Sequence, residues 1–592
     1  MTYGYFESAA AEWSLEKLLE TYTVSDMQML SKICGIPAKT KKGDLVSSLS
    51  KFILSNAFIL YEKLKPISKK AVQETVHRYN GVFDFKRFEA KYNELPSLTS
   101  SSYYYRENPE AEKLSVLIFK GVIPSDLRHI LKEKVPVPDK FDMEYADQLP
   151  ASYELKRGEK RELTVRLTEA EALKNIKILF ALAESGKIKG SEKTGIVSEA
   201  GREIIEKQLF AGDFYEGNES DLKIQSFSLP LIFVSSGYAR YENGRLKLTL
   251  KGIKERQTES AQLLKDIWQK WMNSSFDEFE RIDNIKGRQK GLAKNVKERR
   301  NVIIKALLKM PKEKWVRFSK FSQFMRLNSM YFSVARNSWD LYIGDREYGS
   351  LGYDGYDSWE VLQERYILAL FFEYAATLGI LDIAYVEPEF AKSDFYKNWG
   401  TDDLSYLSRY DGLICFRINV LGRFILGIED KYVPVALPVE KTIKIMQNLE
   451  IAVSKELNKE DQLFLEALAV KSADYMYRLE EKSILHLLEK GHTIDTVTEF
   501  LKARSQNELP SLVLDFLDRI KRKSGLINNL GSAKVLKISD RPTALLIANS
   551  SRLKKLCFFA EPDLIIILLQ NEQKFFKELK SLGYSISQDI LI

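Results

Sequence analysis

The most apolar stretch of the chain, residues 366–386 (YILALFFEYAATLGILDIAYV), restricts most strongly what the protein can fold into. It is long enough to span a membrane, but it contains Glu373 and Asp382, whose charges are costly inside a lipid bilayer. Gly379 interrupts the stretch. We therefore predict a buried helix followed by a strand, in a globular protein that has no membrane partner.

Cysteine and histidine are scarce, which bears on the compartment and on metal binding. The three cysteines, Cys34, Cys415 and Cys557, lie far apart, so no disulfide framework is expected and a reducing, cytoplasmic setting is predicted. The four histidines do not cluster with a cysteine, so we expect no zinc site and no cofactor. The length suggests about three to five domains.

Positive charge is concentrated in one tract, residues 281–320, which holds 14 Lys/Arg against 3 Asp/Glu in a chain of net charge +7. Such a tract can neutralise phosphates, and its binding should weaken as salt rises. The alternative is a solvated basic linker. The candidate DNA-binding residues in this tract are Lys286, Arg288, Lys290, Lys294, Lys297, Arg299 and Arg300.

An aromatic string follows the basic tract between residues 331 and 356 (YFSVARNSWDLYIGDREYGSLGYDGY). Exposed aromatic rings can stack on the bases of a nucleic acid. The alternative is an ordered surface loop whose rings are buried.

Residues 168–250 show the order of elements of a winged helix. Apolar residues at helical spacing in TEAEALKNIKILFALAESGKIKGS predict one helix, Ser198 can cap a second, and Asn243-Gly244 suits a type I′ hairpin turn. In that architecture the second helix enters the major groove and the hairpin contacts the backbone, although winged helices also dock proteins. The candidate DNA-binding residues here are Lys187, Lys189, Lys193, Thr194 and Arg202 near the second helix, and Arg245 and Lys247 on the hairpin.

A second winged-helix-like domain is predicted within residues 276–432. A long helical pattern leads to a strand in ILDIAYVE, and residues 413–419 supply a returning strand after an insertion. Residues 66–138 predict three short helices that form either a helix-turn-helix unit or a simple packing domain.

The N-terminal segment YTVSDMQMLSKICGIPAKTKKGDLV predicts two helices joined by a basic turn, with a helix start signal at Ser25-Asp26. It resembles a SAP-type DNA-binding motif over residues 18–53. The resemblance implies that Lys39, Lys41 and Lys42 meet the DNA backbone. The alternative is a plain helical hairpin.

The C-terminal region, about residues 434–592, is similar to the N-terminal helicase-associated domain of XPB-type DNA helicases. The resemblance rests on YRLEEKSILHLLEKGHTIDTVTEFLKARS, on LPSLVLDFLDRIKRKSGLI and on the tail SSRLKKLCFFAEPDLIIILLQNEQKFFKEL. It implies a compact α+β domain. Further along, AKVLKIS and TALLIAN are predicted to be strands around a turn at residues 540–542.

A helicase motor needs a phosphate-binding loop, and none is found. The only Gly-Lys pair, Gly186-Lys187, is not followed by Ser or Thr, so ATPase activity is not expected. Two carboxylate-lysine sets could serve a metal nuclease, although such triplets are common by chance. They are Asp411, Glu429 and Lys431, and Asp563, Glu572 and Lys574.

These patterns predict a mainly helical, multidomain α+β protein. The predicted domains are 1–62 (helical, SAP-like), 63–150 (helical, with a helix-turn-helix as one option), 151–275 (winged helix with an Asn-Gly wing), 276–432 (basic tract and second winged-helix-like domain) and 433–592 (XPB-like helicase-associated domain).

The function predicted from these features is that of a non-enzymatic DNA-binding accessory protein in DNA repair, transcription or anti-phage defence. It would hold duplex or single-stranded DNA for a partner helicase or nuclease. The alternatives are a protein–protein adaptor that docks onto a helicase complex and, less favoured, a metal-dependent nuclease.

Overall fold

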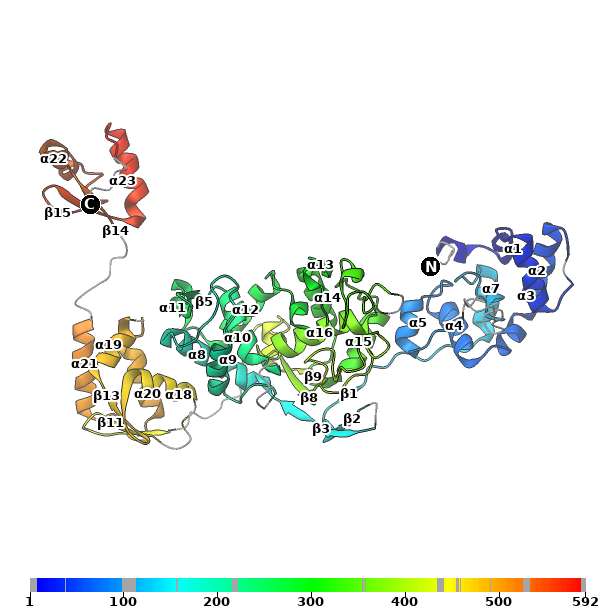
Figure 1. Cartoon of the computed structure of the whole chain (residues 1–592), viewed down its shortest axis with the longest axis horizontal. Coiled ribbons are helices and arrows are strands. Elements are labelled where there is room, and N and C mark those ends of the chain that lie inside the picture. Colours follow the sequence, from blue (N-terminus) through cyan, green and yellow to red (C-terminus); the bar gives the residue numbers. More distant parts are fainter. Residues whose placement is uncertain are drawn as a thin grey trace. The chain divides into compact units, whose positions relative to one another are not determined.

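A computed structural model of the chain describes residues 8–37, 39–97, 113–155, 158–215, 222–353, 356, 358–433, 441–453, 457, 459–489, 491–524 and 533–586. The chain divides into two compact units. The first comprises Met1–Leu437 with Asn458–Leu463, and the second comprises Pro438–Leu457 with Phe464–Ile592. Both units combine helices with small sheets, so the broad α+β class is as predicted (Figure 1).

The N-terminal part of the first unit is helical (Figure 1). Its helices are α1 Leu15–Leu19, α2 Val24–Cys34, α3 Lys42–Glu62, α4 Pro66–His77, α5 Phe85–Tyr92 and α7 Ser125–Lys134. One hydrophobic core runs through them from Leu15 to Val135, across the domain boundary predicted at residue 62. The cap of α2 is Thr23 rather than Ser25: Thr23 and Asp26 form a reciprocal capping box.

The next part contains helices α8 Thr168–Ser185, α9 Glu199–Gln208 and α10 Gln225–Ser235, then the hairpin β5 Ala239–Glu242 and β6 Arg245–Leu248. Ser198 caps α9, as predicted. Asn243 and Gly244 have φ angles of 51° and 69°, which confirms the predicted turn with two positive φ angles. Helix α10 was not predicted, and it lies in sequence between α9 and the hairpin.

A five-stranded antiparallel sheet follows, in the order β1-β7-β9-β8-β4. Its strands are β1 Tyr145–Ala146, β4 Thr164–Arg166, β7 Trp315–Arg317, β8 Leu381–Tyr385 and β9 Leu413–Ile418. The strands predicted in ILDIAYVE and at residues 413–419 are β8 and β9, which pair antiparallel as interior strands of this sheet. The second winged-helix-like domain stays a prediction. A separate hairpin pairs β2 Ser152–Glu154 with β3 Lys160–Glu162.

The apolar stretch at residues 366–386 forms a buried helix and the buried strand β8, as predicted. The helix consists of the π-helical segment Glu360–Glu364, α16 Arg365–Ala369 and the π-helical segment Leu370–Ala375. Around it lie α12 Ser260–Met272, α14 Val296–Leu307 and α15 Phe318–Leu327, all of which contribute to the same core. Within the described ranges, no helix combines the length and apolar character that crossing a membrane requires.

Glu373 is fully buried in this helix. Burial raises the pKa of its carboxyl to about 7, although the nearby Arg281 and Arg409 favour the charged form. Arg281 donates a hydrogen bond of 3.2 Å to the carboxylate, and Tyr410 contacts it through its hydroxyl. The folded protein therefore holds a proton at pH values where an unfolded glutamate, with a pKa of 4.5, has released it.

This pKa difference predicts how stability depends on pH. The free energy of unfolding should fall by about 3 kcal/mol as the pH rises from the unfolded to the folded pKa of Glu373. Glu373→Gln should remove this part of the dependence in urea unfolding measured across that range. Glu203→Gln, at an exposed position of α9, should leave the dependence unchanged. Identical pH profiles for the wild type and Glu373→Gln would contradict the prediction.

The second unit has two sheets. The first has the order β10-β11-β13-β12, and its strands are β10 Ile443–Ile445, β11 Glu450–Val453, β12 Ala469–Ala473 and β13 Met476–Leu479. Helices α19 Glu481–Glu489, α20 Ile494–Arg504 and α21 Ser511–Ser524 accompany this sheet, together with the part of α18 Lys459–Leu468 that begins at Phe464. The predicted core residues Leu479, Ile484 and Leu501 are buried.

The remaining described residues, 533–586, form a sheet of order β14-β16-β15 with two helices. The elements are β14 Ala533–Lys537, α22 Arg541–Asn549, β15 Phe558–Glu561, β16 Leu564–Leu568 and α23 Leu569–Ser581. The strand predicted in TALLIAN is wrong, because this segment is α22. Asp540 caps the helix through the amide of Thr543, and Pro542 occupies its first turn.

Candidate nucleic-acid interface

The structure brings the basic tract and the aromatic string together. Lys286 and Tyr342 exchange main-chain hydrogen bonds of 2.9 and 3.2 Å, and Leu292 is bridged to Ala335. Gly287 has a φ of +78°, and a Cβ atom there would lie 1.8 Å from the carbonyl oxygen of Asp340. Only glycine permits this approach, so the two segments form one continuous surface.

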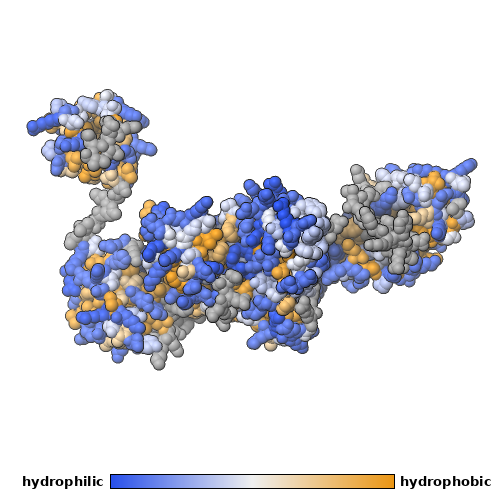
Figure 2. All heavy atoms as spheres, in the orientation of Figure 1, coloured by the Kyte–Doolittle hydropathy of each residue, from blue (hydrophilic) through white to orange (hydrophobic). Residues whose placement is uncertain are grey.

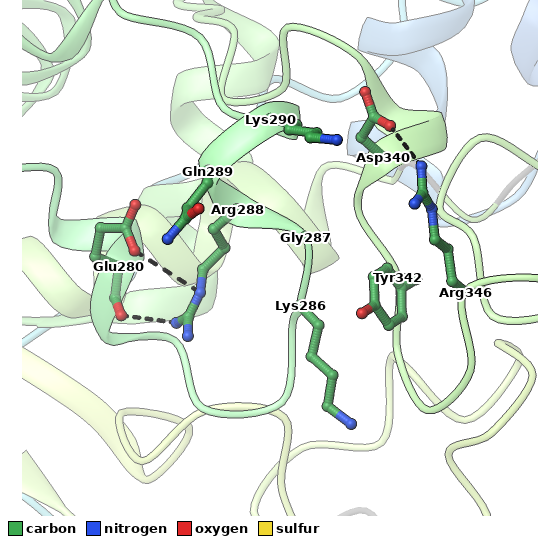
Figure 3. A pocket seen from close by; sticks show the side chains of 9 residues that line it. All are labelled: Glu280, Lys286, Gly287, Arg288, Gln289, Lys290, Asp340, Tyr342 and Arg346. Carbon is green, nitrogen blue, oxygen red and sulfur yellow. Dashed lines mark hydrogen bonds and ion pairs between the residues drawn. The ribbon is translucent and has the colours of Figure 1, made fainter.

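A pocket of about 430 Å³ opens where the two segments meet (Figure 3). It is lined by Glu280, Lys286, Gly287, Arg288, Gln289, Lys290, Asp340, Tyr342 and Arg346. Four of these side chains are cationic and two are carboxylates, so the pocket carries a positive excess. Figure 2 shows strongly hydrophilic surface at the position of α13 (Arg288–Gly291), which supplies part of the lining.

The four cations of the pocket differ in how they are already engaged. The Arg288 side chain turns back, with its Nε 3.9 Å from a Glu280 carboxylate oxygen, and donates to the Glu280 carbonyl at 2.7 Å. Arg346 lies 3.3 Å from Asp340 (Figure 3). Lys286 and Lys290 are exposed and have no carboxylate partner in the described part of the chain; the Lys286 ammonium makes one long contact, 3.5 Å from the carbonyl oxygen of Gly344. These two ammonium groups are therefore available to an anionic ligand.

Large aromatic rings are exposed on the same loop. Trp339 is 56% exposed and Tyr353 is 42% exposed, and their rings meet edge to face with centroids 5.2 Å apart. Tyr348 forms a second exposed pair with Trp399, with centroids 5.3 Å apart. Three of these exposed rings belong to the aromatic string, and Trp399 packs against the string through Tyr348.

Arg299 and Arg300 do not belong to this surface, and their prediction as DNA-binding residues is wrong. Both side chains are completely buried in α14. Arg299 pairs with Asp277 at 2.8 Å and Arg300 pairs with Glu278 at 2.6 Å. These ion pairs hold the protein together, and the guanidinium groups cannot reach a phosphate. Lys294 and Lys297, at the start of the same helix, are exposed and stay candidates.

The residues predicted around the hairpin lie on its second strand or on the neighbouring turn at residues 187–194, and we call them the hairpin surface: Lys187, Lys189, Lys193, Thr194, Arg245 and Lys247. All six are exposed. A β-bridge joins Lys189 to Arg245, whose guanidinium donates to the carbonyl of Gly186 at 3.1 Å. Lys247 lies 3.5 Å from Glu242, so part of the charge here is already compensated.

The helices that precede the hairpin are poorly suited to entering a DNA groove. Helix α10 comes directly before the hairpin, and every residue from Gln225 to Phe233 is buried. Helix α9, the predicted recognition helix, carries Arg202 in a half-buried position and exposes two carboxylates, Glu199 and Glu203, against one lysine, Lys207. Because these carboxylates repel phosphates, Arg202 is the weakest of the candidates in this region.

The third predicted site is the turn before α3. Lys39, Lys41 and Lys42 are all exposed, and Lys42 is the first residue of α3. The side chain of Gln28 on α2 donates to the carbonyl of Lys39 at 3.3 Å, which ties the turn to α2. The turn therefore presents three neighbouring ammonium groups on a helical scaffold.

Three carboxylates of the two carboxylate-lysine sets are engaged in ion pairs. Asp411 is fully buried, contacts Arg365 at 3.0 Å and has a pKa that burial raises. Glu429 pairs with Arg423 at 2.8 Å, and Glu572 pairs with Lys534 at 2.6 Å. Among the described residues, no three side chains of His, Cys, Asp or Glu are grouped so that they could hold a metal ion.

No protein-family model matches the chain, and no curated protein matches it. We therefore infer its function from its own residues.

The pocket cations Lys286, Arg288 and Lys290 were predicted as DNA-binding residues. Tyr342 and Arg346 were missed as individual residues, although both lie in the aromatic string that the sequence singled out.

Proposed function

We propose that the protein is a DNA-binding accessory protein that acts by holding DNA rather than by catalysis. The observation that carries this proposal is that Lys286 and Lys290 line a pocket together with Tyr342, and that the loop that supplies Tyr342 also exposes the rings of Trp339, Tyr348 and Tyr353. Ammonium groups close to the backbone of a nucleic acid neutralise its phosphates, and exposed aromatic rings add stacking contacts with its bases. The protein would act in DNA repair, transcription or anti-phage defence.

The hairpin surface supports a second contact with the same DNA. The order α8, α9, α10 and hairpin resembles that of a winged helix, but α10 is buried and α9 exposes two carboxylates, so neither helix is suited to reading a groove. We infer that the hairpin and the turn at residues 187–194 touch the backbone, without base recognition by a helix. Such contacts position a protein on DNA but do not select a sequence.

Our second candidate function is protein docking, which the exposed apolar residues of the second unit support. Its last part, residues 533–586, exposes Val535, Leu545, Phe558 and Leu569, each more than half exposed. Apolar exposure of this extent is typical of protein interaction sites. Together with the resemblance of residues 434–592 to a helicase-associated domain, this supports docking onto a partner helicase or nuclease.

The DNA-binding proposal predicts the effect of removing the two available ammonium groups. The double variant Lys286→Ala/Lys290→Ala should bind duplex or single-stranded DNA more weakly. The slope of log affinity against log salt should become shallower by about 1.4 to 1.8, because two phosphate contacts are lost. Fluorescence anisotropy of labelled DNA over a salt series measures both quantities.

A matched control removes the same charge from the same tract. Lys305→Ala/Lys309→Ala changes two exposed lysines of α14 and the residues after it, which lie outside the pocket. We expect its salt slope to stay close to that of the wild type. An equal fall in both double variants would show that only net charge matters, and absence of wild-type binding at low salt would refute the proposal.

A further inference from the structure

The rings on the pocket surface are held in place before any ligand arrives. A Cβ atom at Gly352 would lie 2.2 Å from the indole of Trp339, so the glycine allows the ring to lie flat against the main chain. Ser350 donates to the carbonyl of Trp339 at 3.1 Å, and the Tyr353 hydroxyl donates to the carbonyl of Glu347 at 2.9 Å. A fixed ring loses little freedom when a ligand binds, so more of the contact energy appears as affinity.

The two kinds of group on this surface match the two parts of an unpaired nucleotide. Lys286 and Lys290 offer charge to a phosphate, and the Trp339–Tyr353 pair offers an aromatic edge and face. In a duplex, the faces of the bases are stacked on one another and are not accessible to a protein ring. In a single strand the bases can turn outward and stack on aromatic side chains, and this contact tolerates any base.

The volume and the charge of the pocket agree with a ligand that has a phosphate part and a base part. A cavity of about 430 Å³ lies within the range of sites that hold small organic groups. Its cations exceed its carboxylates, and Arg288 and Arg346 are already engaged with Glu280 and Asp340. The pocket therefore offers a moderate positive charge and the ring of Tyr342, and the loop that supplies Tyr342 also carries the exposed rings of Trp339 and Tyr353. Positive charge and exposed rings together are the combination found in sequence-tolerant single-strand binding.

We propose that this surface binds a single-stranded polynucleotide, with bases stacked on Trp339 and Tyr353 and the backbone phosphates beside Lys286 and Lys290. The inference rests on the proposed function and specifies its ligand. Tyr348 and Trp399 form a second ring pair on the loops around the pocket and would take a neighbouring base. Stacking on either pair involves no charge, so it contributes affinity that salt does not screen.

The test compares Trp339→Ala with the wild-type full chain on three probes: an oligodeoxythymidine of about 20 nucleotides, an oligouridine of the same length, and a DNA duplex of matched length. We expect affinity for a single strand to fall about tenfold or more, as loss of one base stack implies. Affinity for the duplex and the salt slope should stay unchanged, because no charge is removed. Trp339→Phe should restore much of the single-strand affinity.

A second aromatic variant serves as the control. Tyr475→Ala removes an exposed ring of similar kind from the second unit, where Tyr475 is 52% exposed, and should leave all three affinities unchanged. A loss on one single-stranded probe alone would identify DNA or RNA as the source of the strand and would support the inference. A variant Trp339→Ala that binds every probe like the wild type would overturn it while leaving DNA binding intact. A wild type that binds none of the probes would overturn the proposed function as well.

Discussion

Replacing Arg300 by methionine is expected to lower the free energy of unfolding by about 3–5 kcal/mol, because the change leaves a buried carboxylate without its cation. Arg300 is completely buried, and its Nε donates to Glu278 at 2.6 Å. Its other nitrogens donate to the carbonyls of Trp271 and Phe276, both at 2.6 Å. Methionine fills similar space but satisfies none of these acceptors.

Urea unfolding of the full chain measures this loss, and Lys305→Met on the same helix is the control. Lys305 is exposed, so its variant should differ from the wild type by less than about 0.5 kcal/mol. Adding Glu278→Gln to Arg300→Met should recover part of the loss, because the uncompensated charge is then removed. If Arg300→Met were as stable as the wild type and its log affinity for DNA depended less steeply on log salt, Arg300 would instead be a DNA-binding residue.

Gly287→Ala is expected to abolish the pocket and with it all of the DNA affinity that depends on Lys286 and Lys290. At a φ of +78° a side chain costs about 1–3 kcal/mol in backbone strain alone. In addition, the new methyl group would lie 1.8 Å from the carbonyl oxygen of Asp340, so the two walls of the pocket must separate. Anisotropy with labelled DNA should show a loss at least as large as that of Lys286→Ala/Lys290→Ala.

Gly427→Ala provides a control with the same backbone strain and no steric conflict. Gly427 has a φ of +74°, and a Cβ atom there would meet nothing within 4 Å. Its variant should lose stability by the strain alone and should keep the DNA affinity of the wild type. If Gly287→Ala bound DNA as the wild type does, the main-chain contact with Asp340 would have no part in forming the interface.

Local signals in the sequence predicted the elements whose causes are local. The buried helix and strand at residues 366–386 followed from apolar length interrupted by Gly379. The hairpin followed from Asn243-Gly244, whose positive φ angles few other pairs tolerate. The helix in TALLIAN was missed because the Asp540 cap and Pro542 were interpreted as a turn, although the same residues also start helices.

Contacts between distant segments could not be predicted in the same way. The basic segment at Lys286 meets Tyr342 through a main-chain ladder, and nothing in either segment specifies its partner. The burial of Arg299 and Arg300 did leave a signal. Val296, Arg299, Arg300 and Ile303 share one helical face, so the spacing placed both arginines on the apolar side of α14. The amino-acid composition of the tract does not reveal this burial, because composition does not depend on which face of the helix each residue occupies.

The pocket surface is assembled by main-chain atoms and by glycines, while the groups that would touch a ligand are side chains that contribute little to that assembly. Lys286 is joined to Tyr342 through amide and carbonyl groups that every amino acid except proline possesses. Substitutions of Lys286 or Lys290 therefore leave the frame in place. Over evolutionary time, ligand preference at this surface can drift faster than the fold, and the same frame offers a designer a scaffold on which a new ligand can be selected.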